Sequence, residues 1–501
     1  MSDETRVATS GGAGTADADA QPLPPFDAAP GSIPTLEVPD PSTWRHLHLV
    51  GIGGAGMRGI AEVLLARGVE VSGSDLKESA GLERLRAAGA TVFVGHRAEQ
   101  VRTPDAVVVS SAVPAANPEA RAARERGIPV LMRAQVLAAL TSGARTIAVS
   151  GTHGKTTTTS MVAVMLSRLG LDPTYVIGGD LNESGSGAGA GRGGYFVAEA
   201  DESDGSFLLF RPEVAVVTNV EADHLDFYGS PERIERAFAE FCRGAETVVA
   251  CWDDPGVRRA LAGCGATVIR YGSQSPDVEL RVVFAGEPGP GPRAQLFIEG
   301  REAPLEVELS VGPRHNVLNA AAAIGVAVAL HLPVEEALSG IASYGGVHRR
   351  FESKGEAGGV LFIDDYAIHP TEIASVLEAA RERAPGRVIG VFQPHRYSRT
   401  AAMWSDLGGS LVAADVAIVT DVYAAWEDPM PGVSGKLVVD SLAEAAPGKR
   451  IIYLPHRADV ASLLAGLVRP GDLVVTLGAG DITTVAEETV GIIRDLAEAS
   501  R

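Results

Sequence analysis

The sequence predicts an α/β protein of three domains. Its 501 residues suffice for about three units of roughly 150 residues each. Apolar runs typical of buried parallel strands alternate with helical segments, and two Gly-rich turns each join such a run to a helix. We expect domains over residues 44–143, 144–345 and 346–501, each with a parallel sheet. A tail over residues 1–43 lacks a hydrophobic period and is expected to be disordered.

Composition favours a soluble protein of a reducing compartment. The net charge of −20 argues against a general binder of nucleic acid or anionic membranes. The longest apolar run, near residues 320–330, is too short to span a bilayer, and no basic segment followed by an apolar core opens the chain. Cys242, Cys251 and Cys264 show no metal-binding spacing. We therefore expect no membrane insertion, no nucleic-acid partner and a cytoplasmic location.

The first domain opens with a Rossmann-like pattern. A strand over residues 45–50 leads into a turn in which Gly51, Gly53 and Gly56 fit G-x-G-x-x-G, and the second strand ends at Asp75. Such a turn binds any diphosphate and such an acid binds any ribose, so a dinucleotide and a UDP-sugar both fit the pattern. The alternative is that the glycines serve only the packing of the helix on the sheet and bind no ligand. A further strand ends in hydroxyls. The candidate ligand residues are Gly53, Gly54, Ala55, Gly56, Met57, Asp75, Ser110 and Ser111.

The second domain opens with a shortened P-loop, which predicts a P-loop ATPase domain. A strand over residues 146–150 leads through a Gly-rich turn into a helix, but Val149 stands where the full pattern has its first glycine. Lys155 would reach the outer phosphates, and the Thr156 hydroxyl would hold Mg²⁺. An ordinary turn with a surface lysine is the alternative. The candidate nucleotide-binding residues are Gly151, Thr152, His153, Gly154, Lys155, Thr156 and Thr157.

Polar side chains follow the next two strands of this domain. Glu199 ends the strand-like run after residue 194, and His224 follows the run after it. Because the carboxyl ends of parallel strands meet at one edge of a sheet, Glu199 is a candidate Mg²⁺ ligand. Imidazole is not a favoured Mg²⁺ ligand, so His224 fits a structural histidine equally well. Asn316 or Asn319 could bind an adenine edge or cap a helix.

The third domain is predicted to be a second Rossmann-like α/β unit with a polar rim. The strand over residues 360–366 ends in acids, and the strand over residues 388–392 is followed by the basic cluster His395, Arg396 and Arg399. This cluster stands out in an acidic chain, with solvated surface as the alternative. No nucleophile elbow, kinase signature, zinc helix or C-x-x-C pair occurs. Phosphoryl transfer from ATP to a carboxylate fits the three sites together.

The order of these motifs resembles that of the Mur ligase family. The matching stretches span residues 50–481, and several are specific to the family. They are VGIGGAGM at 50–57, SSAVP at 110–114, GTHGKTT at 151–157, EADESD at 199–204, TN with DHLD at 218–226, HN with NA at 315–320, RRF at 349–351, QPHRY at 393–397 and TLGAGD at 476–481.

The resemblance implies an ATP-dependent ligase, monomeric or homodimeric, that uses Mg²⁺. UDP-N-acetylmuramate would bind the first domain, ATP the second and L-alanine the third, and the muramate carboxylate would become an acyl phosphate before amide formation. By match, the catalytic residues are Lys155, Glu199, His224 and Arg350, the last at the γ-phosphate. The matching metal ligands are Thr156, Glu199 and His224. Asn319 is implied at adenine, Asp365 at the ATP ribose, and Tyr366, His369, Arg396 and Arg399 on the amino-acid side.

Three positions depart from the family's pattern. Ile368 stands where a histidine usually precedes His369, Arg58 stands where serine is usual, and Trp426 stands where glycine is usual. These departures leave a catalytically retired scaffold open, and other observations leave two further functions open. One is a ligase that adds a tripeptide to UDP-N-acetylmuramate in murein-peptide recycling. A nicotinamide-dependent dehydrogenase would explain the first Gly-rich turn with Asp75, and a catalytically retired scaffold would only bind nucleotide.

Overall fold

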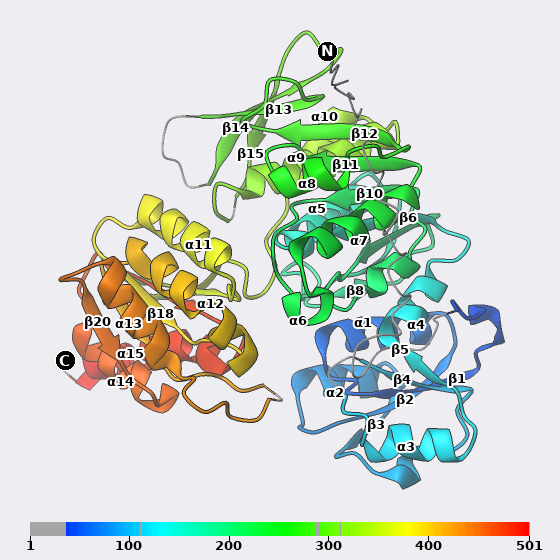
Figure 1. The fold of residues 1–501 in the computed structure, drawn as a ribbon, viewed down its shortest axis with the longest axis horizontal. Helices are drawn as coiled ribbons and strands as arrows, with labels where there is room; N and C mark the ends of the chain where they lie inside the picture. The colour runs from blue at the N-terminus through cyan, green and yellow to red at the C-terminus, as the bar shows by residue number, and fades with distance from the viewer. Residues whose placement is uncertain (1–36, 111–112, 286–290, 311, 426, 500–501) are drawn as a thin grey trace, which may run out of the picture.

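The computed structural model describes residues 37–110, 113–285, 291–310, 312–425 and 427–499. Three sheets follow one another along the chain and form three domains (Figure 1). Most of the tail that was predicted to be disordered lies outside the described residues. Within residues 37–43, however, Pro41–Thr43 forms a 3-10 turn, and the Glu37 carbonyl accepts a hydrogen bond from Gln135. Ordered structure therefore begins before Trp44.

The first domain is built on a five-stranded parallel sheet with the strand order β3-β2-β1-β4-β5. The order reverses between β1 and β4, and ligands bind at such a point in open α/β sheets. This confirms the predicted Rossmann-like unit. Its elements are β1 (His46–Val50), α1 (Ala55–Ala66), β2 (Glu70–Asp75), α2 (Ala80–Ala87), β3 (Thr91–Val94), β4 (Ala106–Val109), α3 (Pro118–Glu125), β5 (Val130–Met132) and α4 (Arg133–Leu140).

The central domain contains a ten-stranded sheet in which β6 lies between β9 and β10. The Gly-rich turn after β6 therefore lies between the ends of these two strands. Antiparallel strands β8, β14 and β15 extend the predicted parallel sheet. The strands are β6 (Arg145–Ser150), β7 (Thr174–Val176), β8 (Ala188–Gly189), β9 (Tyr195–Glu199), β10 (Val214–Val217), β11 (Thr247–Cys251), β12 (Thr267–Gly272), β13 (Leu280–Phe284), β14 (Arg293–Ile298) and β15 (Leu305–Glu308). The helices are α5 (Lys155–Arg168), α6 (Leu225–Tyr228), α7 (Pro231–Arg243), α8 (Pro255–Ala260), α9 (Asn316–Ala329) and α10 (Val334–Ala342).

The third domain has a six-stranded sheet with the order β16-β17-β21-β18-β19-β20, in which only the edge strand β16 is antiparallel. The strands are β16 (Glu352–Ala357), β17 (Val360–Asp365), β18 (Val388–Phe392), β19 (Val416–Val419), β20 (Arg450–Tyr453) and β21 (Leu473–Leu477). The helices are α11 (Pro370–Arg383), α12 (Tyr397–Ser410), α13 (Gly435–Ala445), α14 (Val460–Leu467) and α15 (Thr484–Ala499).

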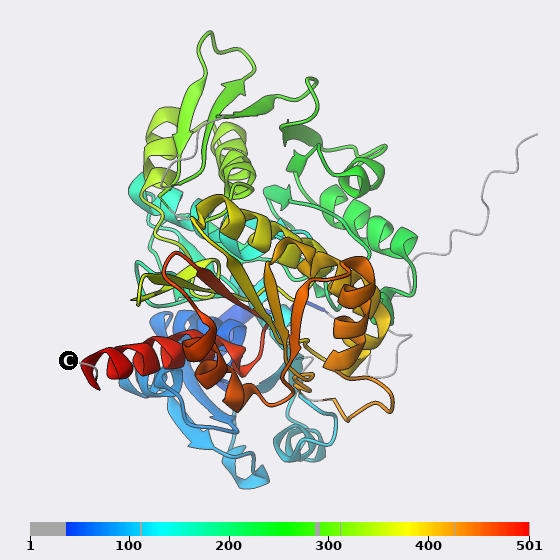
Figure 2. The ribbon, with the colours of Figure 1, turned by 90° about the vertical axis from the view of Figure 1, so that its left-hand side faces the viewer.

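The domains differ in how they are joined. One buried apolar cluster runs from the first domain into the central domain and includes Leu64, Leu137, Phe207 and Phe238. The third domain has apolar clusters of its own, and it lies in front of the other two in Figure 2. Its contacts through α11 to the central domain are polar, which is typical of domains that move relative to each other. Among the described helices, none combines the length and apolar character that a membrane crossing requires.

Candidate active site

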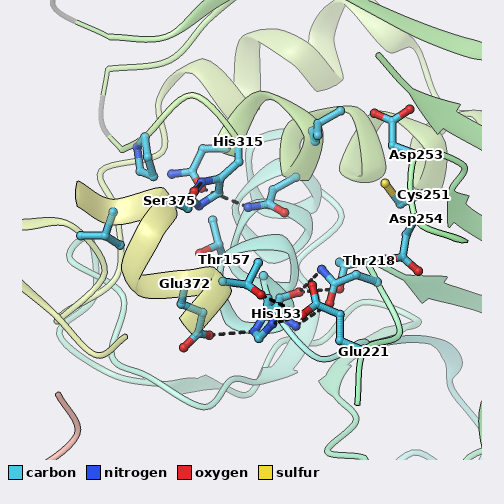
Figure 3. Close-up of a pocket in the computed structure, with 18 of the residues that line it drawn as sticks. His153, Thr157, Thr218, Glu221, Cys251, Asp253, Asp254, His315, Glu372 and Ser375 are labelled. Carbon is cyan, nitrogen blue, oxygen red and sulfur yellow. Dashed lines mark hydrogen bonds and ion pairs between the residues drawn. The ribbon is translucent and has the colours of Figure 1, made fainter. Parts of the chain in front are cut away.

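Three cavities lie along the carboxyl ends of the parallel strands. The first-domain cavity, of about 700 Å³, is bounded by the Gly-rich turn after β1 and includes Asp75. The junction cavity, of about 520 Å³, includes Gly56 of the first domain, Lys155 of the central domain and Tyr366 of the third. The interdomain cavity, of about 420 Å³, lies between the P-loop turn, α9 and α11 (Figure 3).

The first-domain cavity gathers most of the residues predicted to bind the first ligand. Asp75 accepts a hydrogen bond from the N–H of Gly53 at 2.9 Å, so the acid and the turn hold each other in place. A Cβ atom on Gly56 would overlap the guanidinium of Arg133, which lines both this cavity and the junction cavity. No motif identified Arg133. Predicted residues that line the cavity are Gly54, Ala55, Gly56, Met57, Asp75 and Ser110; Ser111 lies outside the described residues.

The P-loop turn packs tightly against its neighbours. Gly151 and Gly154 have φ angles of 137° and 78°, which favour glycine. The N–H groups of Thr152 and His153 donate to the carbonyl and side chain of Asn219, at 3.1 and 2.7 Å. These two N–H groups are therefore already paired within the protein. The N–H groups left for phosphate come from the first turn of α5, where a helix has no internal partners for them.

Lys155 lies against a buried carboxylate. Its Nζ atom donates to Glu202 Oε1 at 2.8 Å and to the carbonyls of Gly151 and Thr152 at 2.6 and 3.2 Å. Burial acts to lower the pKa of Lys155, but Glu202 and Asp201 outweigh it and raise that pKa, so the amine stays charged. A charged, fixed amine at the start of α5 is suited to phosphate binding.

Thr156 and Glu199 are brought together as predicted. The Thr156 hydroxyl donates to Glu199 Oε1 at 3.0 Å, and Glu199 Oε2 accepts the Gly178 N–H at 2.7 Å. Octahedral Mg²⁺ with bonds of about 2.1 Å places adjacent oxygens ~3 Å apart, so these two oxygens fit neighbouring ligand positions. Both residues line the junction cavity.

His224 lies close to Glu202, the carboxylate that pairs with Lys155. Its Nε2 atom is 3.5 Å from Asp223 Oδ2 and 3.7 Å from Glu202 Oε1. Burial lowers the pKa of His224 although Asp223 opposes the shift, which keeps the imidazole neutral and able to coordinate a cation. The backbone of His224 has a φ of 53°, an uncommon conformation for a residue other than glycine. His224 is the residue directly before α6.

The interdomain cavity combines amides with a buried acid. Asn319 donates to Asn316 at 3.0 Å and accepts from Thr158 at 3.2 Å, and both asparagines line the cavity. Asp365 accepts the N–H groups of Phe351 and Ala367 at 2.7 and 2.8 Å. Burial raises the pKa of Asp365 to about 6, although Arg350 opposes the shift. The cavity thus offers hydrogen-bonding groups for a base and for ribose hydroxyls.

Arg350 lines both the interdomain and the junction cavities. Its guanidinium lies 5.3 Å from the ring centroid of Tyr366. Burial acts to lower the pKa of Arg350, but Glu372, Asp365 and Glu199 outweigh it. The preceding Arg349 also lines the junction cavity, but its guanidinium is held within the third domain, since it pairs with Asp364 at 3.2 Å and donates to the carbonyl of Ala479 at 3.1 Å.

The remaining residues predicted on the amino-acid side are spread out. Tyr366 lines the junction cavity. His369 caps α11 and packs on His153, with ring centroids 4.6 Å apart. Arg396 pairs with Glu427 at 2.6 Å, and Arg399 lies 3.3 Å from His395. Within the described part of the chain, the residues that line the three cavities do not include His369, Arg396 or Arg399. Trp426 lies outside the described residues.

Comparison with known proteins places these features in one family. The model of the Mur ligase family, catalytic domain, matches residues 46–145; the Mur ligase middle domain matches 149–327; and the Mur ligase, glutamate ligase domain, matches 349–480. A relative from Rubrobacter xylanophilus, named UDP-N-acetylmuramate–L-alanine ligase, is 49% identical over 448 residues, which cover 88% of this chain and 98% of the relative.

Solved structures agree with this placement. The crystal structure of the UDP-N-acetylmuramate–alanine ligase of Thermotoga maritima has a TM-score of 0.77 and 30% identity, covering 91% of this chain and 100% of that one. A murein peptide ligase from Psychrobacter arcticus has a TM-score of 0.69 over 90% of this chain and 98% of its own. Its identity is 24%, so that likeness concerns the fold.

Proposed function

Since the chain belongs to the Mur ligase family, we propose that it joins L-alanine to the carboxylate of UDP-N-acetylmuramate at the expense of ATP. The observation that carries this proposal is the junction cavity, which is lined by residues of all three domains. Gly56 and Arg133 come from the first domain, Lys155 from the central domain, and Arg350 from the third. Three substrates bound on three domains can meet only at such a place.

The interdomain cavity would bind ATP with its adenine near Asn316 and Asn319 and its ribose near Asp365. Its phosphates would then pass along the start of α5 towards the junction cavity, which Thr156 and Arg350 also line. The first-domain cavity would bind the UDP part of the sugar nucleotide. We assign residues 44–143 to this nucleotide, 144–345 to ATP and 346–501 to the amino acid, with Tyr366, His369, Arg396 and Arg399 on the amino-acid side.

In the proposed reaction, a carboxylate oxygen of the sugar nucleotide attacks the γ-phosphorus of ATP, and ADP leaves. The amine nitrogen of L-alanine then attacks the acyl carbon, phosphate leaves with the attacking oxygen, and the nitrogen loses its proton. Lys155 of the central domain and Arg350 of the third domain stabilise the negative charge of the transferring phosphoryl group. Closure of the third domain excludes water from the acyl phosphate.

Thr156 and Glu199 would hold Mg²⁺, and His224 would serve a second cation site. When bound, the ion would neutralise part of the negative charge of the ATP phosphates. Thr156→Val, which keeps the shape and removes the hydroxyl, is expected to raise the Mg²⁺ concentration for half-maximal rate at least ~10-fold. Thr156→Ser keeps the hydroxyl and serves as the matched control. A normal Mg²⁺ requirement in Thr156→Val would remove Thr156 from the metal site.

A phosphate-release assay tests the proposal. Release is expected only when ATP, UDP-N-acetylmuramate and L-alanine are all present. Release with the tripeptide in place of L-alanine would favour a murein-peptide recycling ligase. Tight NADH binding without binding of the UDP-sugar would favour a dehydrogenase, a function that leaves Lys155, Thr156 and Glu199 without a role. No release at all would indicate a nucleotide-binding scaffold. We further propose a cytoplasmic enzyme that acts as a monomer or a homodimer.

A further inference from the structure

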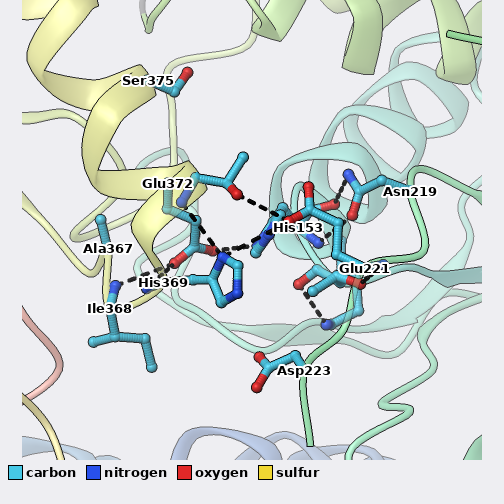
Figure 4. A network of polar contacts seen from close by, with 12 residues as sticks. His153, Asn219, Glu221, Asp223, Ala367, Ile368, His369, Glu372 and Ser375 are labelled. Atoms are coloured by element: carbon cyan, nitrogen blue, oxygen red, sulfur yellow. Dashed lines mark hydrogen bonds and ion pairs between the residues drawn. The ribbon is translucent and has the colours of Figure 1, made fainter. Parts of the chain in front are cut away.

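We propose that His153, Glu221 and His369 bind a divalent transition-metal ion, such as Zn²⁺, where the third domain meets the P-loop turn. Each of the three residues offers one ligand atom, and these atoms lie within 4.8 Å of one another. Figure 4 shows the three side chains converging from three segments of the chain. This transition-metal site is distinct from the Mg²⁺ position proposed at Thr156 and Glu199, and it does not depend on the ligase assignment.

The spacing of the ligand atoms suits a tetrahedral ion. His153 Nε2 lies 3.4 Å from Glu221 Oε2, and His369 Nδ1 lies 3.9 Å from the same oxygen. Zn²⁺ with bonds of about 2.0–2.1 Å separates neighbouring tetrahedral ligands by ~3.4 Å. The first distance already matches. For the second, His369 would have to release the hydrogen bond of 3.4 Å that its Nδ1 atom accepts from the Thr371 N–H and move by about half an ångström.

Burial gives an independent reason to expect a ligand at this place. The Nε2 atoms of His153 and His369 are buried and have no hydrogen-bond partner among the described residues. Such unpaired buried atoms are rare in proteins, since each forfeits its interaction with water. The Nε2 atom of His153 lies 3.4 Å from the Glu221 carboxylate, so a metal ion there would replace a proton, whereas in the described part of the chain no such carboxylate bonds to the Nε2 atom of His369.

Glu372 orients the cluster without belonging to it. Its Oε1 atom lies 3.1 Å from His153 Nδ1, which orients Nε2 towards Glu221. Against the effect of burial, Glu372 and Glu221 raise the pKa of His153 to about 9, so a metal ion would displace the proton on Nε2. The Oε2 atom of Glu372 accepts the N–H groups of Ile368 and His369 at 3.1 and 3.3 Å, so the carboxylate is held in place. A carboxylate behind a coordinating histidine is the usual second layer of a zinc site. Two imidazoles and one carboxylate favour Zn²⁺ or Co²⁺ over Mg²⁺.

The position of the site gives the ion a structural consequence. His153 belongs to the P-loop turn and Glu221 to the segment after β10, whereas His369 caps α11 of the third domain. The ion would therefore join the two domains beside the hydrogen bond of 2.9 Å between Thr371 and Glu221. Bound metal would hold the third domain against the P-loop turn in the position that the structure shows.

Co²⁺ binding to the full metal-free chain, without nucleotide or sugar, tests the proposal. We expect one Co²⁺ per chain with the visible bands of a low-coordinate site, displaced by Zn²⁺ but not by Mg²⁺. His369→Ala and the conservative Glu221→Gln are each expected to lower Zn²⁺ affinity at least ~10-fold, because even loss of a second-layer partner costs that much. His456→Ala, at an exposed histidine, is the control and should not change the affinity.

Two further results decide the position of the ion. Glu199→Gln should leave Zn²⁺ affinity unchanged, because Glu199 belongs to the other cation site. The proposal would be overturned if the Zn²⁺ affinity of both His369→Ala and Glu221→Gln equalled that of the wild type. It would also be overturned if the chain did not bind Co²⁺. The same holds if Glu199→Gln lost as much Zn²⁺ affinity as His369→Ala. Because no substrate is present, these outcomes leave the ligase assignment untouched.

Discussion

The Nζ atom of Lys155 lies 2.8 Å from the Oε1 atom of Glu202, and the two side chains are only 15% and 3% exposed. The carboxylate comes from the segment after β9, so the lysine of the P-loop is fixed by the neighbouring strand. Two carbonyls of the turn accept its other protons. The charge that would face the phosphates is therefore positioned by groups of the central domain itself.

Glu202→Ala is expected to lower the free energy of unfolding by ~3–5 kcal/mol, because it leaves a buried ammonium without its counter-charge. Urea-induced unfolding followed by circular dichroism measures the change. Glu488→Ala, which removes half of a more exposed ion pair with Arg457, is the control and should cost no more than ~1 kcal/mol. Equal losses of unfolding free energy in the two variants would show that the Lys155–Glu202 pair stabilises the fold no more than a more exposed ion pair does.

Lys155→Ala is expected to reduce kcat at least ~100-fold, because the amine acts on the charge that develops during phosphoryl transfer. Binding of the UDP-sugar to the first domain, measured by calorimetry, should be unchanged, since the first-domain cavity does not include Lys155. If sugar-nucleotide binding were lost together with turnover, the division of the substrates among the domains would be wrong.

Protonation of Asp365 is expected to make the KM for ATP depend on pH. Its folded pKa of about 6 lies above the ordinary value, so the carboxylate is ionised above pH 6 and becomes protonated as the pH falls through that value. A neutral carboxyl accepts hydrogen bonds from ribose hydroxyls more weakly, so the KM for ATP should rise below pH 6. Asp365→Asn cannot titrate, and its KM should be high and nearly independent of pH. A wild-type KM that is constant from pH 5 to pH 8 would exclude this role.

Ile368 tests the amino-acid pocket. Its backbone N–H donates to Glu372, whereas its side chain cannot make a hydrogen bond. Restoring the histidine that is usual here, with Ile368→His, is expected to lower the KM for L-alanine by ~2–10-fold, the value of one hydrogen bond. Steady-state kinetics measures this, with Ile368→Leu as the apolar control. An unchanged KM in Ile368→His would show that the histidine is dispensable in this chain.

Much of the fold and part of the site followed from local sequence patterns. Apolar runs that end in glycine or in acids predicted the three sheets. The carboxyl ends of parallel strands meet at one edge of a sheet, which predicted that Glu199 lies near the P-loop, and the structure shows it hydrogen-bonded to Thr156. The antiparallel pairing of the strands at the sheet edges was not predicted, because short alternating runs do not reveal their partners.

Contacts between distant segments lay beyond the reach of the sequence. Arg349 and Arg350 are adjacent, chemically equal and both line the junction cavity, yet Arg350 also reaches the interdomain cavity whereas Arg349 pairs with Asp364 of β17. Only the packing of Asp364 and of the loop after β21 separates their roles. For the same reason no pattern predicted that His153 of the P-loop would meet Glu372 of α11, since the two residues come close only when separate domains pack together.

In the proposed reaction, a carboxylate held by the first domain attacks the γ-phosphate at the junction cavity. Oxygen-18 in the carboxylate of UDP-N-acetylmuramate tests it directly, with mass spectrometry of the phosphate released when ATP and L-alanine are present. An acyl phosphate passes one carboxylate oxygen to each phosphate, so fully labelled carboxylate should give phosphate with one heavy oxygen per turnover. Unlabelled phosphate, formed together with the amide product, would contradict the account.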